Sequence, residues 1–211
     1  MSERLRPLFF LAAIAGASYY VVDHRLAAGA LHTVWKGAGV GLLALWAAGV
    51  ARDRDGWLLA AVMALGAAGD VLLEVAGLRV GAVAFLGGHL VAIVLYLRHR
   101  RAVRAQGRAV ALALLVATPL VSWLLSHDVG VALYASGLGA MAACAWMSRF
   151  PRGLVGLGVM LFVLSDWLIF ARAGVLAGSV VPDLVIWPAY FGGQALIAWG
   201  VATALHEETR A

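Results

Sequence analysis

The stretch Gly66-Ala-Ala-Gly-Asp70-Val-Leu-Leu-Glu74 places two carboxylates one helical turn apart inside an otherwise uncharged apolar run. An ionisable side chain in hydrocarbon costs about 2.5–3.5 kcal/mol on insertion scales, so it usually faces a helix-bundle interior and marks a pathway or a site. A second stretch, Phe162-Val-Leu-Ser-Asp166-Trp-Leu-Ile-Phe170, likewise places a carboxylate, that of Asp166, inside an apolar run. We therefore expect an all-α membrane protein with Asp70 and Asp166 at its functional site.

The composition agrees with this expectation. Of 211 residues, 64% are apolar and 13% are charged, which lies far outside the range of soluble globular proteins. The net charge of +5 comes from basic residues in alternate connections between apolar runs, a pattern typical of membrane topology rather than of nucleic-acid binding. We therefore expect no nucleic-acid partner. The lone Cys144 excludes an intramolecular disulfide and a Cys-rich metal site.

Eight apolar runs of roughly 15–22 residues can be marked, each close to the ~20 residues that cross ~30 Å of hydrocarbon. They lie near residues 8–22, 31–50, 57–76, 80–97, 109–126, 129–147, 154–171 and 184–205. The connections are short, so we expect one polytopic membrane domain over residues 1–211. The first run is also compatible with a cleaved signal peptide, but its continuation through Tyr19 to Val22 favours a retained helix.

The arginines predict the orientation of these helices. With the N-terminus in the cytoplasm, twelve arginines fall in inner segments and three, Arg25, Arg79 and Arg172, in outer ones. This bias predicts eight crossings with both termini inside. We expect a multi-pass protein of a bacterial inner membrane. The basic linker from Arg98 to Arg108 suggests contact with anionic lipid, or else only enforces the topology.

Polar residues from six of the predicted helices reach a common depth. A rise of ~1.5 Å per residue puts them about 6–16 Å from the outer ends of their helices. They are Lys36, Asp70, His89, Tyr134, Asp166, Tyr190 and Gln194. An inward-facing, wet cavity would satisfy all of them at once. Alternatively, the aspartates are structural and are neutralised by protonation or by hydrogen bonds to neighbouring helices.

Glu74, Lys36 and His89 have two interpretations each. Glu74 shares a helix face with Asp70, which suits paired carboxylates or a cation site, or it is a solvated helix end. Lys36 would attract a lipid phosphate or an aspartate, or it snorkels to the interface. His89 with carboxylates would suit zinc, but no His-x-x-x-His spacing supports a metal, and we expect none and no cofactor. The other outer histidines, His24, His32 and His127, are interpreted as interfacial.

A weak internal repeat accompanies the aspartates. Phe85-Leu-Gly-Gly-His89 resembles Tyr190-Phe-Gly-Gly-Gln194, and each follows a helix that carries an embedded aspartate. Four helices separate the aspartates, so two four-helix halves would run in parallel, related by an axis near the membrane normal. Chance similarity of glycine-rich apolar sequence is the alternative.

Together these residues resemble the YhhN family, whose animal members are lysoplasmalogenases. The resemblance rests on Lys36, Gly-Asp70, Phe85 with His89, Ser-Asp166 and Tyr190-Phe-Gly-Gly-Gln194, and it spans Lys36 to about Ala198. The chain departs from the family pattern at three positions. Gly37 follows the lysine where the family commonly has Pro, Ala92 stands where it has Tyr, and Phe191 replaces the second Tyr of a pair.

The resemblance implies hydrolysis of the alkenyl ether bond of a lysoplasmalogen, giving a fatty aldehyde and a glycerophospho-alcohol. Vinyl ethers hydrolyse by protonation at carbon and water attack on the oxocarbenium ion, which needs an acid, a base and a stabilising negative charge. Asp70 and Asp166 would supply these by sharing a proton, and His89 would orient one of them or the water. Lys36 or Tyr190 would hold the phosphate, and Glu74, Tyr134 and Gln194 complete the expected substrate contacts.

Two other classes of function fit the same residues. A small proton-coupled transporter would use the carboxylates as a relay, and a lipid-binding membrane protein would use the cavity without chemistry. For the enzyme, the expected partners are a lysophospholipid substrate, entering sideways from the bilayer, and the surrounding membrane lipids.

Overall fold

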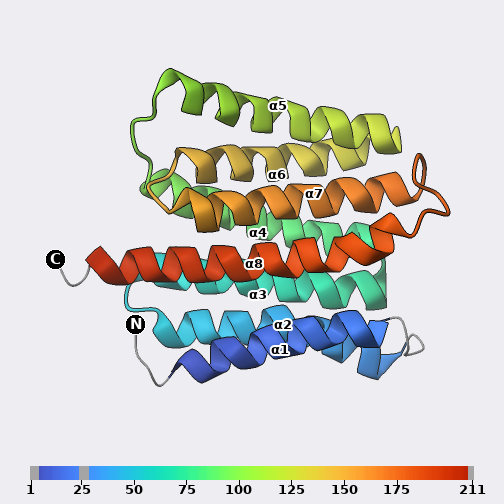
Figure 1. Cartoon of the computed structure of the whole chain (residues 1–211), viewed down its shortest axis with the longest axis horizontal. Coiled ribbons are helices and arrows are strands. Elements are labelled where there is room, and N and C mark those ends of the chain that lie inside the picture. The colour runs from blue at the N-terminus through green and yellow to red at the C-terminus, as the bar shows by residue number, and fades with distance from the viewer. Residues whose placement is uncertain (1–4, 24–28, 209–211) are drawn as a thin grey trace. The chain divides into compact units, whose positions relative to one another are not determined.

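The computed structural model describes residues 5–23 and 29–208, most of which are helical (Figure 1). In chain order the helices are α1 (Arg6–Asp23), α2 (Ala30–Val50), α3 (Arg54–Ala76), α4 (Leu78–Arg98), α5 (Ala105–Ser126), α6 (Val129–Met147), the π-helical turn η2 (Arg152–Gly156), α7 (Leu157–Arg172) and α8 (Val181–Glu208). These residues include no β-strand, and an isolated bridge joins Arg100 to Ser148. The all-α class is therefore confirmed.

Seven of the described helices are long and apolar enough to cross a membrane: α2 to α6, η2 with α7, and α8. Within α1, the shorter apolar segment Arg6–Val21 falls below that length. Large apolar side chains on the helices are exposed, as expected of surfaces that face lipid, among them Ile14, Leu45, Val83, Leu112 and Leu133. The chain is thus an integral multi-pass membrane protein, whereas eight crossings and the orientation remain predictions.

Local sequence explains where several helices begin and end. The Asp53 carboxylate accepts a hydrogen bond from Gly56 N at 2.8 Å, and Asp128 accepts from Gly130 N at 2.6 Å, so each caps the helix that follows. Between α3 and α4 stands a single residue, Gly77, with φ of 85°. A side chain is disfavoured in that conformation, so glycine permits the abrupt corner between the two helices.

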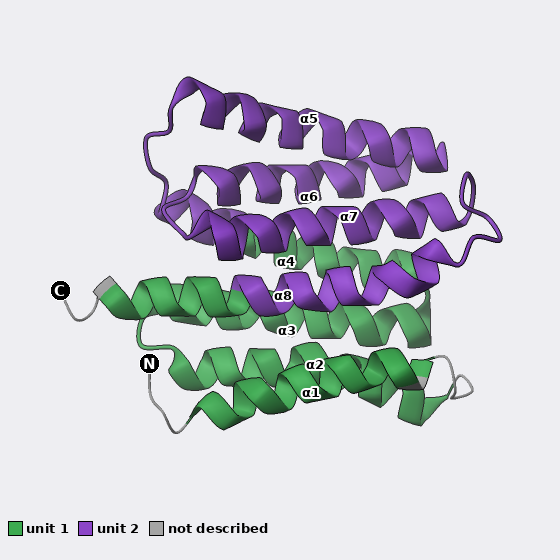
Figure 2. Ribbon diagram, viewed as in Figure 1, with its two compact units in different colours: residues 1–92, 198–211 green, residues 93–197 purple. Residues whose placement is uncertain are grey.

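The chain divides into two compact units, coloured separately in Figure 2. Unit 1 comprises residues 1–92 and 198–211, and unit 2 comprises residues 93–197. In unit 1, α2 packs against both α1 and α3, and in unit 2, α5, α6 and α7 pack against one another. The boundaries fall inside α4 and α8. The parallel repeat and the single-domain description remain predictions.

Glycines let the aspartate-bearing helices pack closely within each unit. In unit 1, a Cβ on Gly69 would lie 2.7 Å from the Phe85 ring, so that ring rests directly on the α3 backbone beside Asp70. In unit 2, Gly158 of α7 and Gly193 of α8 face each other, and a Cβ on either would lie 2.6–2.7 Å from the carbonyl oxygen of the other. In both units the Gly-Gly helix therefore contacts the helix that carries the embedded aspartate.

Candidate functional site

Asp70 and His89 are the most deeply buried ionisable residues among the predicted site residues of unit 1. They are 2% and 3% exposed and belong to α3 and α4, respectively. The Phe85 ring, one helical turn before His89, sits on Gly69 and fixes how α4 lies against this part of α3. A buried carboxyl and a buried imidazole on two closely packed helices are the groups that acid–base chemistry uses.

At the ends of α2 and α3, Lys36 and Glu74 form an ion pair. The Lys36 ammonium donates to Glu74 Oε1 at 2.5 Å, and the two side chains are 17% and 27% exposed. Glu74 is therefore paired as well as near the end of its helix, whereas the position of Lys36 relative to the membrane interface remains a prediction. Because the carboxylate restrains the ammonium, Lys36 is held at a defined position in the protein.

His32 connects this ion pair to the end of α1. Its Nε2 lies 2.7 Å from Asp23 Oδ1 and 3.1 Å from the Tyr19 hydroxyl, and its Nδ1 lies 3.8 Å from Glu74 Oε2. His32 is 8% exposed, so its ring is buried against these partners, and its position at the membrane interface remains a prediction. Burial places its ring among polar partners rather than in solvent.

Contacts join Tyr19, Asp23, His32, Lys36 and Glu74 into one polar cluster. The cluster was not predicted, although the sequence contains a spacing that indicates it. Tyr19 donates to Asp23 at 2.8 Å, and these two residues are four apart, as are His32 and Lys36. Spacing by four puts two polar side chains on one helix face. Asp70 and Glu74 share that spacing, so α1, α2 and α3 each carry one such pair. The pairs lie near the C-terminal ends of α1 and α3 and near the N-terminal end of α2.

In unit 2 the central feature is a hydrogen bond between two predicted site residues. The Tyr134 hydroxyl of α6 donates to Asp166 Oδ2 of α7 at 2.7 Å. Asp166 is 5% exposed, and its neighbour Ser165 is fully buried. The Tyr134 ring meets Phe170, one turn beyond Asp166, edge to face at 6.4 Å. Asp166 is thus a buried carboxyl whose orientation is fixed by a phenol from another helix.

Tyr190 and Gln194 lie on α8 and are 6% and 2% exposed. The Tyr190 ring packs edge to face on Phe162 of α7 at a centroid distance of 5.3 Å. Trp187 stacks on Phe191 at 5.9 Å, so aromatic rings surround this part of α8. Phe162 is one turn before Asp166, and the contact therefore ties the Tyr190 turn to the aspartate-bearing helix.

The predicted site residues fall into two groups. Unit 1 carries Lys36, Asp70, Glu74 and His89, and unit 2 carries Tyr134, Asp166, Tyr190 and Gln194. The structure brings Lys36 together with Glu74, and Tyr134 together with Asp166. That all of these residues serve one cavity remains a prediction.

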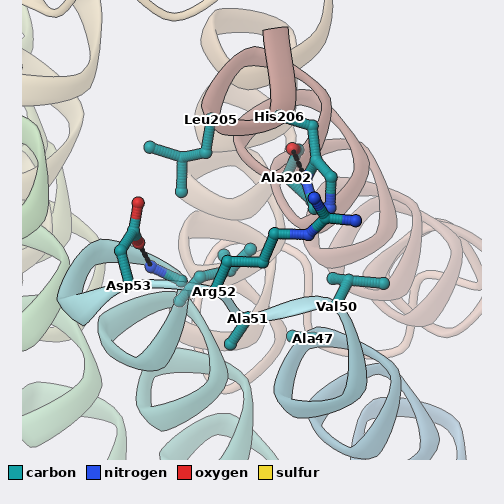
Figure 3. Close-up of a pocket in the computed structure, with 10 residues that line it drawn as sticks. Ala47, Val50, Ala51, Arg52, Asp53, Ala202, Leu205 and His206 are labelled. Carbon is teal, nitrogen blue, oxygen red and sulfur yellow. Dashed lines mark hydrogen bonds between the residues drawn. The ribbon is translucent and has the colours of Figure 1, made fainter. Parts of the chain in front are cut away.

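A pocket lies elsewhere in unit 1, where α2 ends, α3 begins and α8 ends (Figure 3). Its lining includes Arg52, Asp53 and His206 beside small and aliphatic residues. Asp53 is engaged with Gly56 N, and His206 Nδ1 lies 2.8 Å from the Ala202 carbonyl oxygen. None of the predicted site residues lines this pocket.

Comparisons with curated proteins and with solved structures give no match. The model of the YhhN family matches residues 31–201, which begin with the first turn of α2 and end within α8. The matched region contains all of the predicted site residues, whereas Tyr19 and Asp23 of α1 precede it. Because the family model matches well over half of the chain, the chain belongs to the YhhN family.

Proposed function

We propose that this protein is a membrane hydrolase that cleaves the alkenyl ether bond of a lysoplasmalogen. The products are a fatty aldehyde and a glycerophospho-alcohol. Family membership supports a role of this kind, and one observation carries the proposal furthest. It is the buried Asp166 carboxyl with the Tyr134 hydroxyl 2.7 Å from its Oδ2, because an oriented carboxyl shielded from water suits proton transfer.

The chemistry needs little more than well-placed carboxyl groups. A carboxylic acid adds a proton to the alkenyl carbon remote from oxygen, and the adjacent carbon becomes an oxocarbenium ion. Water attacks that ion and gives up a proton to a carboxylate, which forms a hemiacetal. The hemiacetal collapses to the aldehyde and the free alcohol, so water supplies the added atoms and the acid is regenerated.

The proposal assigns these proton transfers to Asp70 and Asp166. Tyr134 holds the Asp166 carboxylate by one oxygen and leaves the other for proton transfer or for stabilising positive charge. His89, buried on α4 and anchored through Phe85, is assigned to orienting the water or a carboxyl group. General acid–base help of this kind is typically worth about 10²–10⁴-fold in rate.

Lys36 is assigned to the phosphate of the substrate. Its ammonium is already held by Glu74, and a cation with a fixed position binds a phosphate without a further loss of side-chain freedom. Glu74 is therefore a positioning residue for Lys36. Tyr190 and Gln194 are assigned to the remaining polar contacts of the head group or glycerol.

The experiment uses purified protein in detergent and two lysophospholipids that share a head group. One carries a 1-alkenyl chain, and the other carries the saturated 1-alkyl ether, which has no double bond to protonate. The proposal predicts aldehyde from the first and no product from the second. A proton-coupled transporter or a lipid-binding protein would release no aldehyde from either, and that result would reject the proposal.

A further inference from the structure

Two connections of unit 2 are joined into one surface. Arg100, between α4 and α5, forms an antiparallel bridge with Ser148, between α6 and η2. On either side of that bridge, Arg101 N donates to the Met147 carbonyl at 3.1 Å, and Arg149 N donates to the His99 carbonyl at 2.9 Å. The two connections thus hold each other by backbone hydrogen bonds.

Buried side chains anchor this junction. Ser148 is fully buried and Phe150 is 1% exposed. Arg149 Nε donates to His99 Nδ1 at 2.8 Å, and the Arg149 guanidinium lies 5.3 Å from the centroid of the Phe150 ring. His99 also packs on Phe150 at 5.0 Å. These side chains hold the two connections in place, so the exposed residues of the connections are carried on a fixed backbone.

The outward side of this junction is strongly cationic. Residues 98–108 and 147–156 contain seven arginines and no Asp or Glu. Arg149 belongs to the buried anchor, and we call the other six, Arg98, Arg100, Arg101, Arg104, Arg108 and Arg152, the arginine surface. Five of them, Arg100, Arg101, Arg104, Arg108 and Arg152, are exposed and make no ion pair with any described residue.

The other end of α7 differs. There Arg172 lies 3.6 Å from Asp183, so an arginine outside the arginine surface has a carboxylate partner. Like charges held close together on a fixed scaffold repel one another unless an anion lies among them. Membrane topology depends on how many arginines a connection contains and does not require that two connections be held together. The arrangement therefore suits an anion supplied from outside the chain.

We propose that the arginine surface binds the phosphate groups of anionic phospholipids in the adjoining leaflet. Both connections join membrane-crossing helices, so the surface lies at the level of lipid head groups. Guanidinium groups match phosphate in shape and bind it through two parallel hydrogen bonds. Arg152 lies 4.9 Å from the Trp146 ring centroid, and an arginine beside a tryptophan is typical of side chains at a membrane interface. This inference is independent of the proposed hydrolase activity.

Thermal unfolding of the purified protein in neutral detergent tests the inference. Phosphatidylglycerol is expected to raise Tm, since a ligand that binds the folded state stabilises it. Phosphatidylcholine at the same concentration is expected to leave Tm unchanged. Glycerol phosphate distinguishes a lipid from a free phosphate as the source. An equal effect of glycerol phosphate, or of phosphatidylcholine, would overturn the lipid assignment.

The variant Arg101→Gln/Arg104→Gln identifies the surface. Each arginine near an anionic lipid surface contributes about fivefold to binding, so the double variant should bind phosphatidylglycerol about 25-fold more weakly. The control Arg172→Gln should bind as the wild type does. Arg108→Gln, expected to lose about fivefold, replaces the double variant if that variant does not fold. If folded Arg101→Gln/Arg104→Gln binds phosphatidylglycerol as the wild type does, the proposal is contradicted. If Arg108→Gln has to be used instead, wild-type binding by that folded variant contradicts it equally.

Discussion

Tyr134 on α6 and Asp166 on α7 are joined by a hydrogen bond of 2.7 Å, which orients a carboxyl group that is 5% exposed. A hydrogen bond to a charged group is worth about 1.5–3 kcal/mol, so Tyr134→Phe should lower kcat about 10- to 100-fold. Tyr96→Phe is the control, because Tyr96 is a buried tyrosine of unit 2 whose ring packs on Phe150. Equal activity of the two folded variants would show that the Tyr134 hydroxyl has no catalytic role.

The two aspartates should be separately essential. Asn keeps the shape of Asp but cannot donate a carboxylic proton or carry a negative charge, so Asp70→Asn and Asp166→Asn should each lose at least about 100-fold in kcat. The double variant should be little worse than either single one, because groups that act as a unit are strongly non-additive. Near-normal turnover with a lowered Tm would instead mark the carboxyl groups as structural.

Lys36 and Glu74 should be energetically coupled. Their side chains are only 17% and 27% exposed, so water screens the ion pair less than it screens a pair at the surface. In a cycle of Lys36→Met, Glu74→Gln and the double variant, we expect a coupling of about 1 kcal/mol in unfolding free energy, read from Tm in detergent. Strictly additive effects on Tm would mean that the pair contributes nothing.

The same pair should act on substrate binding. Removal of the ammonium in Lys36→Met should raise KM with a smaller change in kcat, because the phosphate is remote from the bond that breaks. Glu74→Gln should raise KM less, since it only releases Lys36 from its position. A fall in kcat with unchanged KM in Lys36→Met would place this lysine at the reacting group instead.

The contact between α7 and α8 offers a stability test with an internal control. A Cβ on Gly158 or Gly193 would lie 2.7 Å and 2.6 Å from backbone oxygen, whereas one on Gly192 meets nothing within 4 Å. Overpacking costs about 1–3 kcal/mol, so Gly158→Ala and Gly193→Ala should lower Tm. Gly192→Ala should leave Tm unchanged or raise it, because alanine favours helix. A fall in Tm for Gly192→Ala as large as for Gly193→Ala would refute the packing argument.

The sequence was sufficient to predict the helical class, because continuous apolar runs of about 20 residues suit membrane-spanning helices, whereas barrel strands have about 10 residues and alternate in polarity. It was also sufficient to single out Asp70 and Asp166, since a carboxyl group in an apolar run is costly and therefore conspicuous. In the structure both are almost fully buried, at 2% and 5% exposed. What these residues do is still a prediction.

The partners of polar residues near helix ends could not be predicted in the same way. Water near a helix end makes a polar side chain inexpensive, so the presence of Glu74 and His32 in the sequence does not indicate which residues they contact. Which residues they meet depends on the rotation of α1, α2 and α3 about their axes, and close packing at Gly37, where a Cβ would lie 2.7 Å from Val71, contributes to that rotation. Polar residues four apart on neighbouring helix ends are the pattern that would have indicated the cluster.

Hydrolysis of a 1-alkenyl lysophospholipid in D₂O, with immediate reduction of the aldehyde to prevent exchange, tests whether the reaction begins with protonation at carbon. If a carboxyl group protonates the alkenyl carbon, the product carries one deuterium on the carbon next to the former aldehyde carbon. Asp166→Asn should form this product at least about 100-fold more slowly. Absence of aldehyde with folded wild-type protein, or an aldehyde without that deuterium, would contradict the proposed reaction.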